Sequence, residues 1–238
     1  MRVAALFDIH GNLPALEAVL AELEDDCAVL VGGDAASGPM PAETLELLRS
    51  LSERVHFVRG NADRVLDLTG LPELNRQGRL WVAERLGDEA LQFLNGLPLD
   101  VVLDVDGLGA VRFCHGAPGS DEEPITRATP DERLRGLLAG IGESVVVCGH
   151  THVQFDRTVD GVRVVNAGSV GAPYEARLGA YWLLAGPSIS LRRTPYDVHA
   201  AAERIRATGY PNLAYLDELV MEDPSRPERM SALIEQAV

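Results

Sequence analysis

The chain has 238 residues, of which 46% are hydrophobic and 24% are charged, and its formal net charge is -15. These proportions are those of an ordinary globular protein, long enough for one large domain or for one domain with a small cap. The acidic excess argues against non-specific binding to nucleic acid or to an anionic membrane, because such binding depends on basic side chains. All 21 basic residues are arginines, which excludes chemistry that requires a lysine.

The three cysteines, Cys27, Cys114 and Cys148, lie within or beside apolar runs and form no C-x-x-C pair. We therefore expect buried free thiols in a reducing compartment. The sequence shows no signal-peptide pattern and no apolar run near the roughly 20 residues that a membrane-spanning helix needs. Together these features predict a cytoplasmic protein.

The first part of the chain alternates predicted strands with predicted helices. The apolar run from Arg2 to Phe7 predicts a strand, and Asp8 and His10 follow directly. Asn12 can cap a helix whose apolar stripe begins at Leu13. The Asp and His side chains should therefore project together from the end of this strand.

Two further strands, expected at 27–31 and 55–59, end in a similar way. A Gly-Asp pair that ends at Asp34 follows the first, and a Gly-Asn pair that ends at Asn61 follows the second; a helix from Pro41 lies between them. The carboxyl ends of parallel strands meet at one edge of a sheet, where binding sites form. Ordinary turns would explain any one of these strand ends, but explain three in succession less well.

The segment 64–97 is predicted to be helical without intervening strands. Its apolar residues recur at helical spacing, and Asn95-Gly96 provides a C-terminal stop. We expect a small helical cap that follows the third strand and covers the site. Trp81 should fill core within this cap, with a substrate contact as the alternative.

The second part of the chain is rich in expected strands, at 101–104, 111–113, 145–148, 154–159, 162–166, 180–184 and 188–193. Asp-Gly turns at 106–107 and 160–161 are hairpin signals between two pairs of these strands. A helix is expected over 130–141 with Thr129 as its N-cap. From Tyr196 onward the chain should be helical, and we find no catalytic signal there.

The stretch from Val145 to His152, VVVCGHTH, predicts a buried strand followed by Gly149 and two histidines, His150 and His152. Neutral imidazoles bind divalent transition metals, and a glycine lets the backbone approach a crowded centre. An H-x-H pair alone is about as often structural as metal-binding. His115, directly after another expected strand, adds a third imidazole at a strand end.

Seven residues of metal-ligand type thus follow expected strands: Asp8, His10, Asp34, Asn61, His115, His150 and His152. The ordered set Asp-x-His, Gly-Asp, Gly-Asn, His-Gly and Gly-His-x-His resembles the calcineurin-like metallophosphoesterase family, and in detail its small bacterial phosphoesterases. The resemblance covers roughly residues 1 to 194 and implies a four-layer α/β fold, with two mixed β-sheets face to face and helices outside. The order of the predicted elements independently indicates the same class.

The resemblance also implies a dinuclear metal site. It places one ion on Asp8, His10 and His152, the other on Asn61, His115 and His150, and Asp34 as a bridge between them. This mixture of ligands suits Mn, Fe, Zn, Co or Ni better than Mg or Ca. Asp34, Asn61 and His115 would serve catalysis as well as metal binding. For the phosphate contact beside Asn61 we expect Arg64, just after the Gly-Asn turn, with Arg177 and Arg59 as further candidates.

One position departs from the family pattern. Many members carry a histidine directly after the Gly-Asn, where it protonates the leaving group or holds the phosphate, and the small phosphodiesterases often carry a cysteine. Here the position is Ala62, which cannot donate a proton. Stabilisation of the leaving group must then come from metal, water or another residue, and a phosphodiesterase is favoured.

We therefore expect a single domain over 1–238, with a helical cap insertion at 64–97 and a C-terminal helical extension at 196–238. The predicted function is that of a dinuclear phosphodiesterase, which hydrolyses its substrate by a hydroxide that bridges the two ions. The alternatives are a phosphatase for phosphoproteins or nucleotides, including a dinucleoside polyphosphate hydrolase, and a non-catalytic scaffold of the same fold. The expected partner is a small phosphoester or phosphorylated substrate, and a homo-oligomer is compatible with the sequence.

Overall fold

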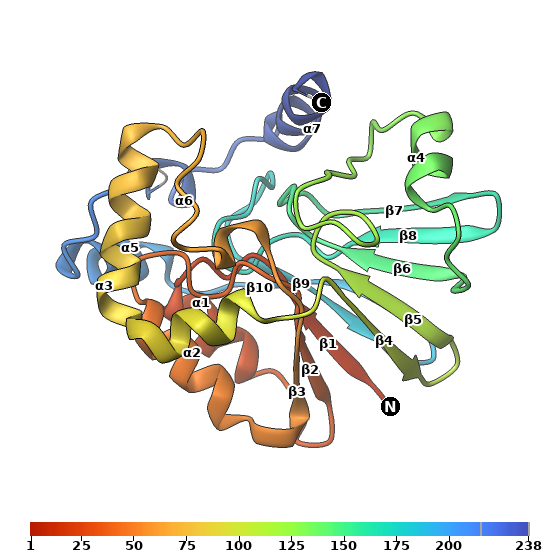
Figure 1. Ribbon diagram of the computed structural model, residues 1–238, viewed down its shortest axis with the longest axis horizontal. Helices are drawn as coiled ribbons and strands as arrows, with labels where there is room; N and C mark the ends of the chain where they lie inside the picture. The colour runs from red at the N-terminus through yellow and green to blue at the C-terminus, as the bar shows by residue number, and fades with distance from the viewer. Residues whose placement is uncertain (215, 238) are drawn as a thin grey trace.

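The computed structural model of the chain describes residues 1–214 and 216–237, with two five-stranded sheets (Figure 1). The strands of the first sheet, in spatial order, are β10 (Ile189–Thr194), β9 (Ala180–Ala185), β1 (Val3–Leu6), β2 (Ala28–Val31) and β3 (Val55–Phe57). Those of the second are β4 (Asp100–Val105), β5 (Gly109–Cys114), β6 (Val145–Cys148), β8 (Val162–Asn166) and β7 (Phe155–Val159).

Both sheets are mixed. In the first sheet β1, β2 and β3 are parallel, and β9 and β10 add antiparallel pairs at one side. In the second sheet β5, β6 and β8 are parallel, while β4 and β7 pair antiparallel at the two edges. The Asp-Gly turns join β4 to β5 and β7 to β8 as predicted, and both residues of the second turn, Asp160 and Gly161, have the positive φ that tight hairpins favour.

The two sheets pack face to face through apolar side chains. Phe7 and Leu30 from the first sheet share one buried cluster with Phe113, Val147 and Val165 from the second. Alternate residues of each strand point to this layer, and the others point outward to helices. The sheets therefore enclose the main core, as the predicted sandwich requires.

Helices cover the outer faces of both sheets (Figure 1). On the first sheet, α1 (Leu13–Leu20) and α2 (Pro41–Ser50) contribute Leu16 and Leu48 to a cluster with strand residues. On the second, α4 (Asp131–Leu137) buries Leu134. The remaining helices are α3 (Glu73–Asn95), α5 (Val198–Ala207), α6 (Leu216–Leu219) and α7 (Arg226–Gln236), with short 3-10 turns η1 (Ser52–Arg54) and η2 (Asn61–Asp63).

The four-layer α/β fold is confirmed, and one local prediction is wrong. Helix α4 begins at Asp131, so Pro130 and not Thr129 is its N-cap. The Thr129 hydroxyl is already used in a preceding turn, where it accepts from the backbone nitrogen of Thr126 at 2.9 Å, and it donates to Glu235 at 2.7 Å. This hydroxyl ties the loop to α7 instead of capping the helix.

Two other predictions concern the cysteines and the absence of a membrane-spanning helix. All three cysteines are buried and free, as expected. Within the described residues, no helix combines the length and the apolar character that crossing a bilayer requires. The longest helix, α3, is interrupted at Gly87, whose φ of 71° and ψ of 170° are not helical.

Candidate metal centre

The predicted ligands lie where strands of both sheets end. Asp8 and His10 follow β1, Asp34 follows β2, and Asn61 follows β3 in the turn η2. His115 follows β5, and the pair His150 and His152 follows β6. Two groups of these residues have ligand atoms within 4.8 Å of one another: Asp8, His10 and His152, and Asp8, Asp34 and His115. Asp8 belongs to both groups.

The side-chain oxygen Asp8 Oδ1 is at the centre of this cluster. It lies 3.2 Å from Nε2 of His152, 3.8 Å from Nε2 of His10 and 3.9 Å from Nε2 of His115. Asp8 is completely buried, and Oδ1 has no hydrogen-bond partner in the part of the chain that the structure describes. A buried charged oxygen without a partner is costly unless a metal ion or another cation neutralises it.

Hydrogen bonds orient the histidine rings toward the cluster. His115 donates from Nδ1 to the carbonyl of Gly32 at 2.9 Å, and His152 donates from Nδ1 to the carbonyl of Ala172 at 2.6 Å. Because Nδ1 carries the proton in each neutral ring, the lone pair of Nε2 points at Asp8. His10 is held similarly, since its Nδ1 is 3.0 Å from the Ser37 hydroxyl while its Nε2 is 3.2 Å from Nε2 of His152. Lone pairs therefore converge on one point, which is the environment a divalent cation fits.

Asp34 forms the second half of the cluster. Its Oδ2 lies 3.6 Å from Nε2 of His115 and 3.9 Å from Nε2 of His10, so it faces both groups. Its Oδ1 accepts a hydrogen bond from the backbone nitrogen of Ala62 at 2.8 Å. Asn61 joins this side, with Oδ1 3.2 Å from Nε2 of His115.

His150 lies beside the cluster with its ring turned toward a loop. Its Nε2 is 3.0 Å from the carbonyl oxygen of Glu122, and its ring centroid is 4.9 Å from that of His115. Its backbone nitrogen donates to Asp8 Oδ2 at 2.8 Å. The structure thus gives His150 a role in holding Asp8, and its role as a ligand stays a prediction.

Five predicted ligands have positive φ angles, in the left-handed region that residues other than glycine rarely adopt: Asp8, His10, Asp34, His150 and His152. Such strain persists where the surrounding fold enforces it and concentrates at functional sites. Gly149 shows how tightly the site is built, because a Cβ there would lie 2.4 Å from Cδ1 of Phe7 and 2.7 Å from Asp8 Oδ2. The glycine that precedes the two histidines is therefore a steric requirement.

Burial and the neighbouring carboxylates set the protonation of the cluster. Burial lowers the pKa of His10, and it lowers the pKa of His150 to about 4. Burial also opposes the charged form of His152, but the Asp8 carboxylate, the Ala172 carbonyl and the charge of Asp34 together outweigh it and raise the pKa of His152. Burial and the charge of Asp34 raise the pKa of Asp63 to about 7; Asp63 accepts from the backbone nitrogens of Gly60 and Asp34 and so holds two strand-end loops together.

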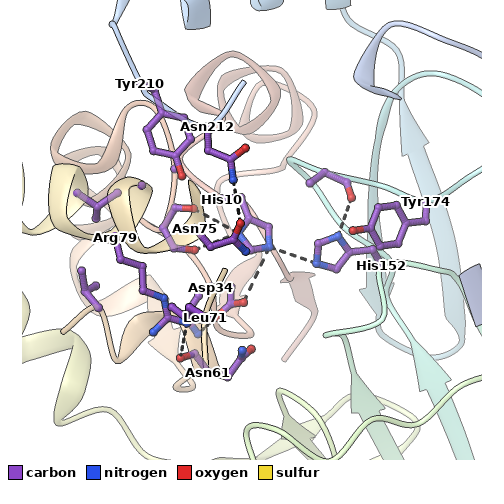
Figure 2. Close-up of a pocket in the computed structure, with 17 residues that line it drawn as sticks. His10, Asp34, Asn61, Leu71, Asn75, Arg79, His152, Tyr174, Tyr210 and Asn212 are labelled. Carbon is purple, nitrogen blue, oxygen red and sulfur yellow. Dashed lines mark hydrogen bonds and ion pairs between the residues drawn. The ribbon is translucent and has the colours of Figure 1, made fainter. Parts of the chain in front are cut away.

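A cavity of about 300 Å³ opens from this cluster (Figure 2). His10, Asp34, Asn61 and His152 line its inner side. The opposite side is formed by α3 and by the segment between α5 and α6, through the side chains and backbone of Asn75, Gly78, Arg79, Tyr210 and Asn212. The helical segment predicted as a cap does line the site, as does part of the C-terminal extension.

Arg64, the arginine predicted to contact phosphate, does not line this cavity. It pairs with Glu122, and its Nε is 3.6 Å from Asp121 Oδ2. Arg79 of α3 lines the cavity instead. No sequence motif distinguishes four cavity residues from the other polar residues of their helices and loops, so they could not be predicted: Arg79, Asn75, Tyr210 and Asn212.

With this geometry established, comparison with known proteins identifies the family. The model of the calcineurin-like phosphoesterase superfamily domain matches residues 1–185. The chain therefore belongs to the calcineurin-like phosphoesterase superfamily, as the ordered set of strand-end residues predicted.

Three relatives show how far the likeness extends. An uncharacterized protein of Methanocaldococcus jannaschii is 28% identical over 230 residues, which cover 85% of this chain and 91% of the relative. The crystal structure of a metallophosphoesterase from Sphaerobacter thermophilus is 25% identical, with a TM-score of 0.75 over 92% of this chain and 98% of its own. A hypothetical protein from Pyrococcus horikoshii OT3 is 21% identical and shares the fold, with a TM-score of 0.80 over 94% of this chain and 99% of its own.

Proposed function

We propose that this protein is a dinuclear metal-dependent phosphoesterase that hydrolyses a phosphodiester. The observation that carries the proposal is the convergence of Asp8 Oδ1 with the Nε2 atoms of His10 and His152 in a buried site beside the cavity. Without a cation, these lone pairs would face one another out of water, at a considerable cost in free energy. The family and the fold support the same activity.

The proposed ligand sets are those that the family resemblance implies, and the grouping of Asp8, His10 and His152 supports the first of them. Asp8, His10 and His152 would hold one ion, and Asn61, His115 and His150 the other, with Asp34 shared between them. When bound, the ions supply positive charge for the phosphoryl group and a water of lowered pKa as the nucleophile. Mn, Fe, Zn, Co and Ni are the metals that this mixed set of ligands suits best.

The remaining residues position these groups. The carbonyls of Gly32 and Ala172 fix the rings of His115 and His152, and the backbone nitrogen of Ala62 fixes one oxygen of Asp34. Metal ligands whose outer hydrogen bonds are lost typically bind about 10 to 100 times more weakly. The rigid strand ends therefore contribute to affinity as well as to geometry.

Two features favour a diester over a monoester. Ala62 lines the cavity, and it stands at the position where the family resemblance implies a side-chain acid for the leaving group. In addition, the cavity continues from the metal ligands to Tyr210 and Asn212, which leaves room for an organic group on the phosphate that is not expelled. A small phosphoester is the expected substrate.

The test combines metal analysis of the purified protein with two chromogenic substrates, bis(p-nitrophenyl) phosphate and p-nitrophenyl phosphate. We expect two transition-metal ions per chain, loss of both activities after chelation, recovery with Mn²⁺ and a higher kcat/KM for the diester. A higher kcat/KM for the monoester would make the protein a phosphatase. Hydrolysis of neither substrate by the metal-loaded protein would favour a non-catalytic scaffold.

A further inference from the structure

The outer wall of the cavity is formed by residues that take no part in the metal cluster. Asn75 and Gly78 come from α3, and Tyr210 and Asn212 come from the segment between α5 and α6. Asn212 donates from Nδ2 to Asn75 Oδ1 at 3.3 Å, and the hydroxyl of Tyr210 is so near Gly78 that a Cβ there would lie 2.7 Å from it. Figure 2 shows Tyr210, Asn212 and Asn75 grouped on the cap side of His10. Two distant parts of the chain thus build one wall.

The polar side chains of this wall are uncharged. Asn75, Asn212 and Tyr210 carry amide and hydroxyl groups, and burial raises the pKa of Tyr210 to about 12, so its hydroxyl keeps its proton. Asn75 and Asn212 share one hydrogen bond, which uses neither Nδ2 of the first nor Oδ1 of the second, so these atoms are available as donor and acceptor. Such a wall would recognise a neutral group with both donors and acceptors.

Apolar side chains line the same cavity as the polar wall. They are Leu71, Val65 and Val82. Pockets that combine apolar surfaces with a few placed polar groups bind small organic molecules, and about 300 Å³ is the lower end of the usual size range. A nucleobase on its ribose has this combination of apolar faces and a hydrogen-bonding edge, whereas a lipid chain or a cationic head group does not.

Arg79 lies between the wall and the metal ligands. Its guanidinium donates to the carbonyls of Arg64 and Asp67, each at 2.8 Å, and to that of Asn61 at 3.4 Å. Among the described residues it forms no ion pair with a carboxylate. The nearby Asp67 carboxyl, whose pKa is lowered first by hydrogen bonds from Thr69, is also influenced by the charge of Arg79. A phosphate that enters the cavity would be attracted by this charge.

We propose that the wall formed by Asn75, Tyr210 and Asn212 binds the nucleoside group of a phosphodiester substrate, with Arg79 beside the phosphate. This inference rests on the proposed phosphodiesterase function, and it names the class of organic group that the substrate carries on its phosphate. Asn75, Tyr210 and Asn212 determine specificity, and the strand-end residues carry the chemistry.

The first experiment uses three diesters that release the same leaving group, so that only the retained group differs. They are thymidine 5′-(p-nitrophenyl phosphate), p-nitrophenyl phosphorylcholine and bis(p-nitrophenyl) phosphate. We expect kcat/KM for the thymidine ester to exceed that for the choline ester by about ten-fold or more, since each hydrogen bond lost or left unmade typically costs a factor of 2 to 12. Asn75→Ala and Asn212→Ala should each lower the ratio of thymidine to bis(p-nitrophenyl) kcat/KM by about three- to ten-fold.

The matched control is Gln77→Ala. Gln77 lies on the exposed side of α3 and bonds to Glu73 at 3.0 Å, outside the cavity lining. This variant should keep the wild-type kcat/KM for every substrate. Loss of the thymidine preference in Gln77→Ala as well would indicate a general disturbance of α3 and overturn the assignment to the wall.

A second experiment measures binding without catalysis. The ring of Trp81 lies edge-on to Tyr210 with centroids 5.2 Å apart, whereas the other tryptophan, Trp182, is buried in the sheet and bonded to Thr194. Thymidine added to the chelator-treated protein should therefore change the fluorescence of Trp81 in a saturable way. The Kd should rise about three- to ten-fold in Asn212→Ala, and the signal should be lost in Trp81→Phe.

The outcomes separate the two proposals. Hydrolysis of bis(p-nitrophenyl) phosphate without preference for the thymidine ester, and without thymidine binding, would overturn the nucleoside site and leave the phosphodiesterase standing. Saturable thymidine binding without hydrolysis of any diester would support the wall as a nucleoside site and overturn the proposed activity. A preference for the choline ester would overturn the nucleoside assignment.

Discussion

Replacement of Asp34 by Asn should separate metal binding from folding. Asp34 is 3% exposed, and its Oδ2 lies within 4 Å of Nε2 of both His10 and His115. Asparagine keeps a carbonyl oxygen that can accept the hydrogen bond from the backbone nitrogen of Ala62. The substitution therefore removes one negative charge and retains most of the shape.

The expected loss of metal affinity follows from that charge. A unit charge about 4 Å from a cation interacts by about 4 kcal/mol per unit of cation charge at an effective dielectric constant of 20, so each ion should bind at least about 10³-fold more weakly. At a metal concentration 100 times the wild-type Kd, the ions stabilise the folded wild type by about 2.7 kcal/mol per site, and nearly all of this stabilisation should disappear. In the metal-free protein two effects oppose each other, because the charge of Asp34 repels buried Asp63 but favours the protonated form of His115, so the substitution should change stability much less than it changes metal binding.

Thermal unfolding with and without Mn²⁺, together with equilibrium dialysis, measures both effects. Asp104→Asn is the control, since Asp104 is an exposed aspartate of β4 remote from the strand-end cluster. We expect Asp104→Asn to keep the metal-dependent rise in Tm and Asp34→Asn to lose it. If Asp34→Asn bound both ions with wild-type affinity, Asp34 would not be the bridging ligand.

Three further predictions concern single positions. Gly149→Ala should lower the free energy of unfolding, measured in urea, by about 1–3 kcal/mol, because the added Cβ would overlap Phe7. Gly136→Ala, in open space within α4, should raise the free energy of unfolding by about 0.5–1 kcal/mol. Equal effects of the two substitutions would refute the steric argument. Because Ala62 offers no acid, a plot of log kcat/KM against the pKa of the leaving group should fall steeply, and Ala62→His should raise kcat/KM for alkyl esters about ten-fold or more. A flat plot for the wild type would reveal another acid. Burial raises the pKa of Tyr196 to about 12, so between pH 10 and 12 the unfolded chain loses this proton first, and the free energy of unfolding should fall by up to about 1.4 kcal/mol per pH unit. Urea titrations of Tyr196→Phe should show a shallower fall over this pH range, and an unchanged slope would contradict the assignment.

The strand-end cluster could be predicted because its information is local. Each ligand directly follows an apolar run, and parallel strands bring their carboxyl ends to one edge whatever lies between them. The positions of Asp8 and His10 could be inferred from the predicted strand β1 alone, and that of Asp34 from β2 alone. The ordered set of motifs supplied the assignment to a family, which periodicity alone does not provide.

The outer wall could not be predicted because it depends on packing between distant segments. Tyr210 and Asn212 lie more than 130 residues after Asn75 in the chain, and each alone is an ordinary loop residue. Sequence proximity also favoured Arg64 as the phosphate contact, yet Arg64 pairs with Glu122, and Arg79 lines the cavity from the next helix. The direction of a long side chain depends on its ion-pair partners, and the partners of Arg64 are more than 55 residues away.

The backbone of the ligands links the fold to the chemistry. Asp8, His10 and Asp34 adopt positive φ although none is a glycine, and each such residue costs on the order of 1–3 kcal/mol. Hydrogen bonds between neighbouring strand ends offset this strain: the backbone nitrogen of Asp8 donates to the carbonyl of Gly33 at 3.2 Å, and that of His10 donates to the carbonyl of Asp34 at 2.8 Å. Because the bonds join the ends of β1 and β2, the strained conformations depend on the completed sheet and do not arise in either segment alone. The completed sheets therefore fix the backbone that carries these side chains, so that the binding of an ion would require little further ordering of the backbone.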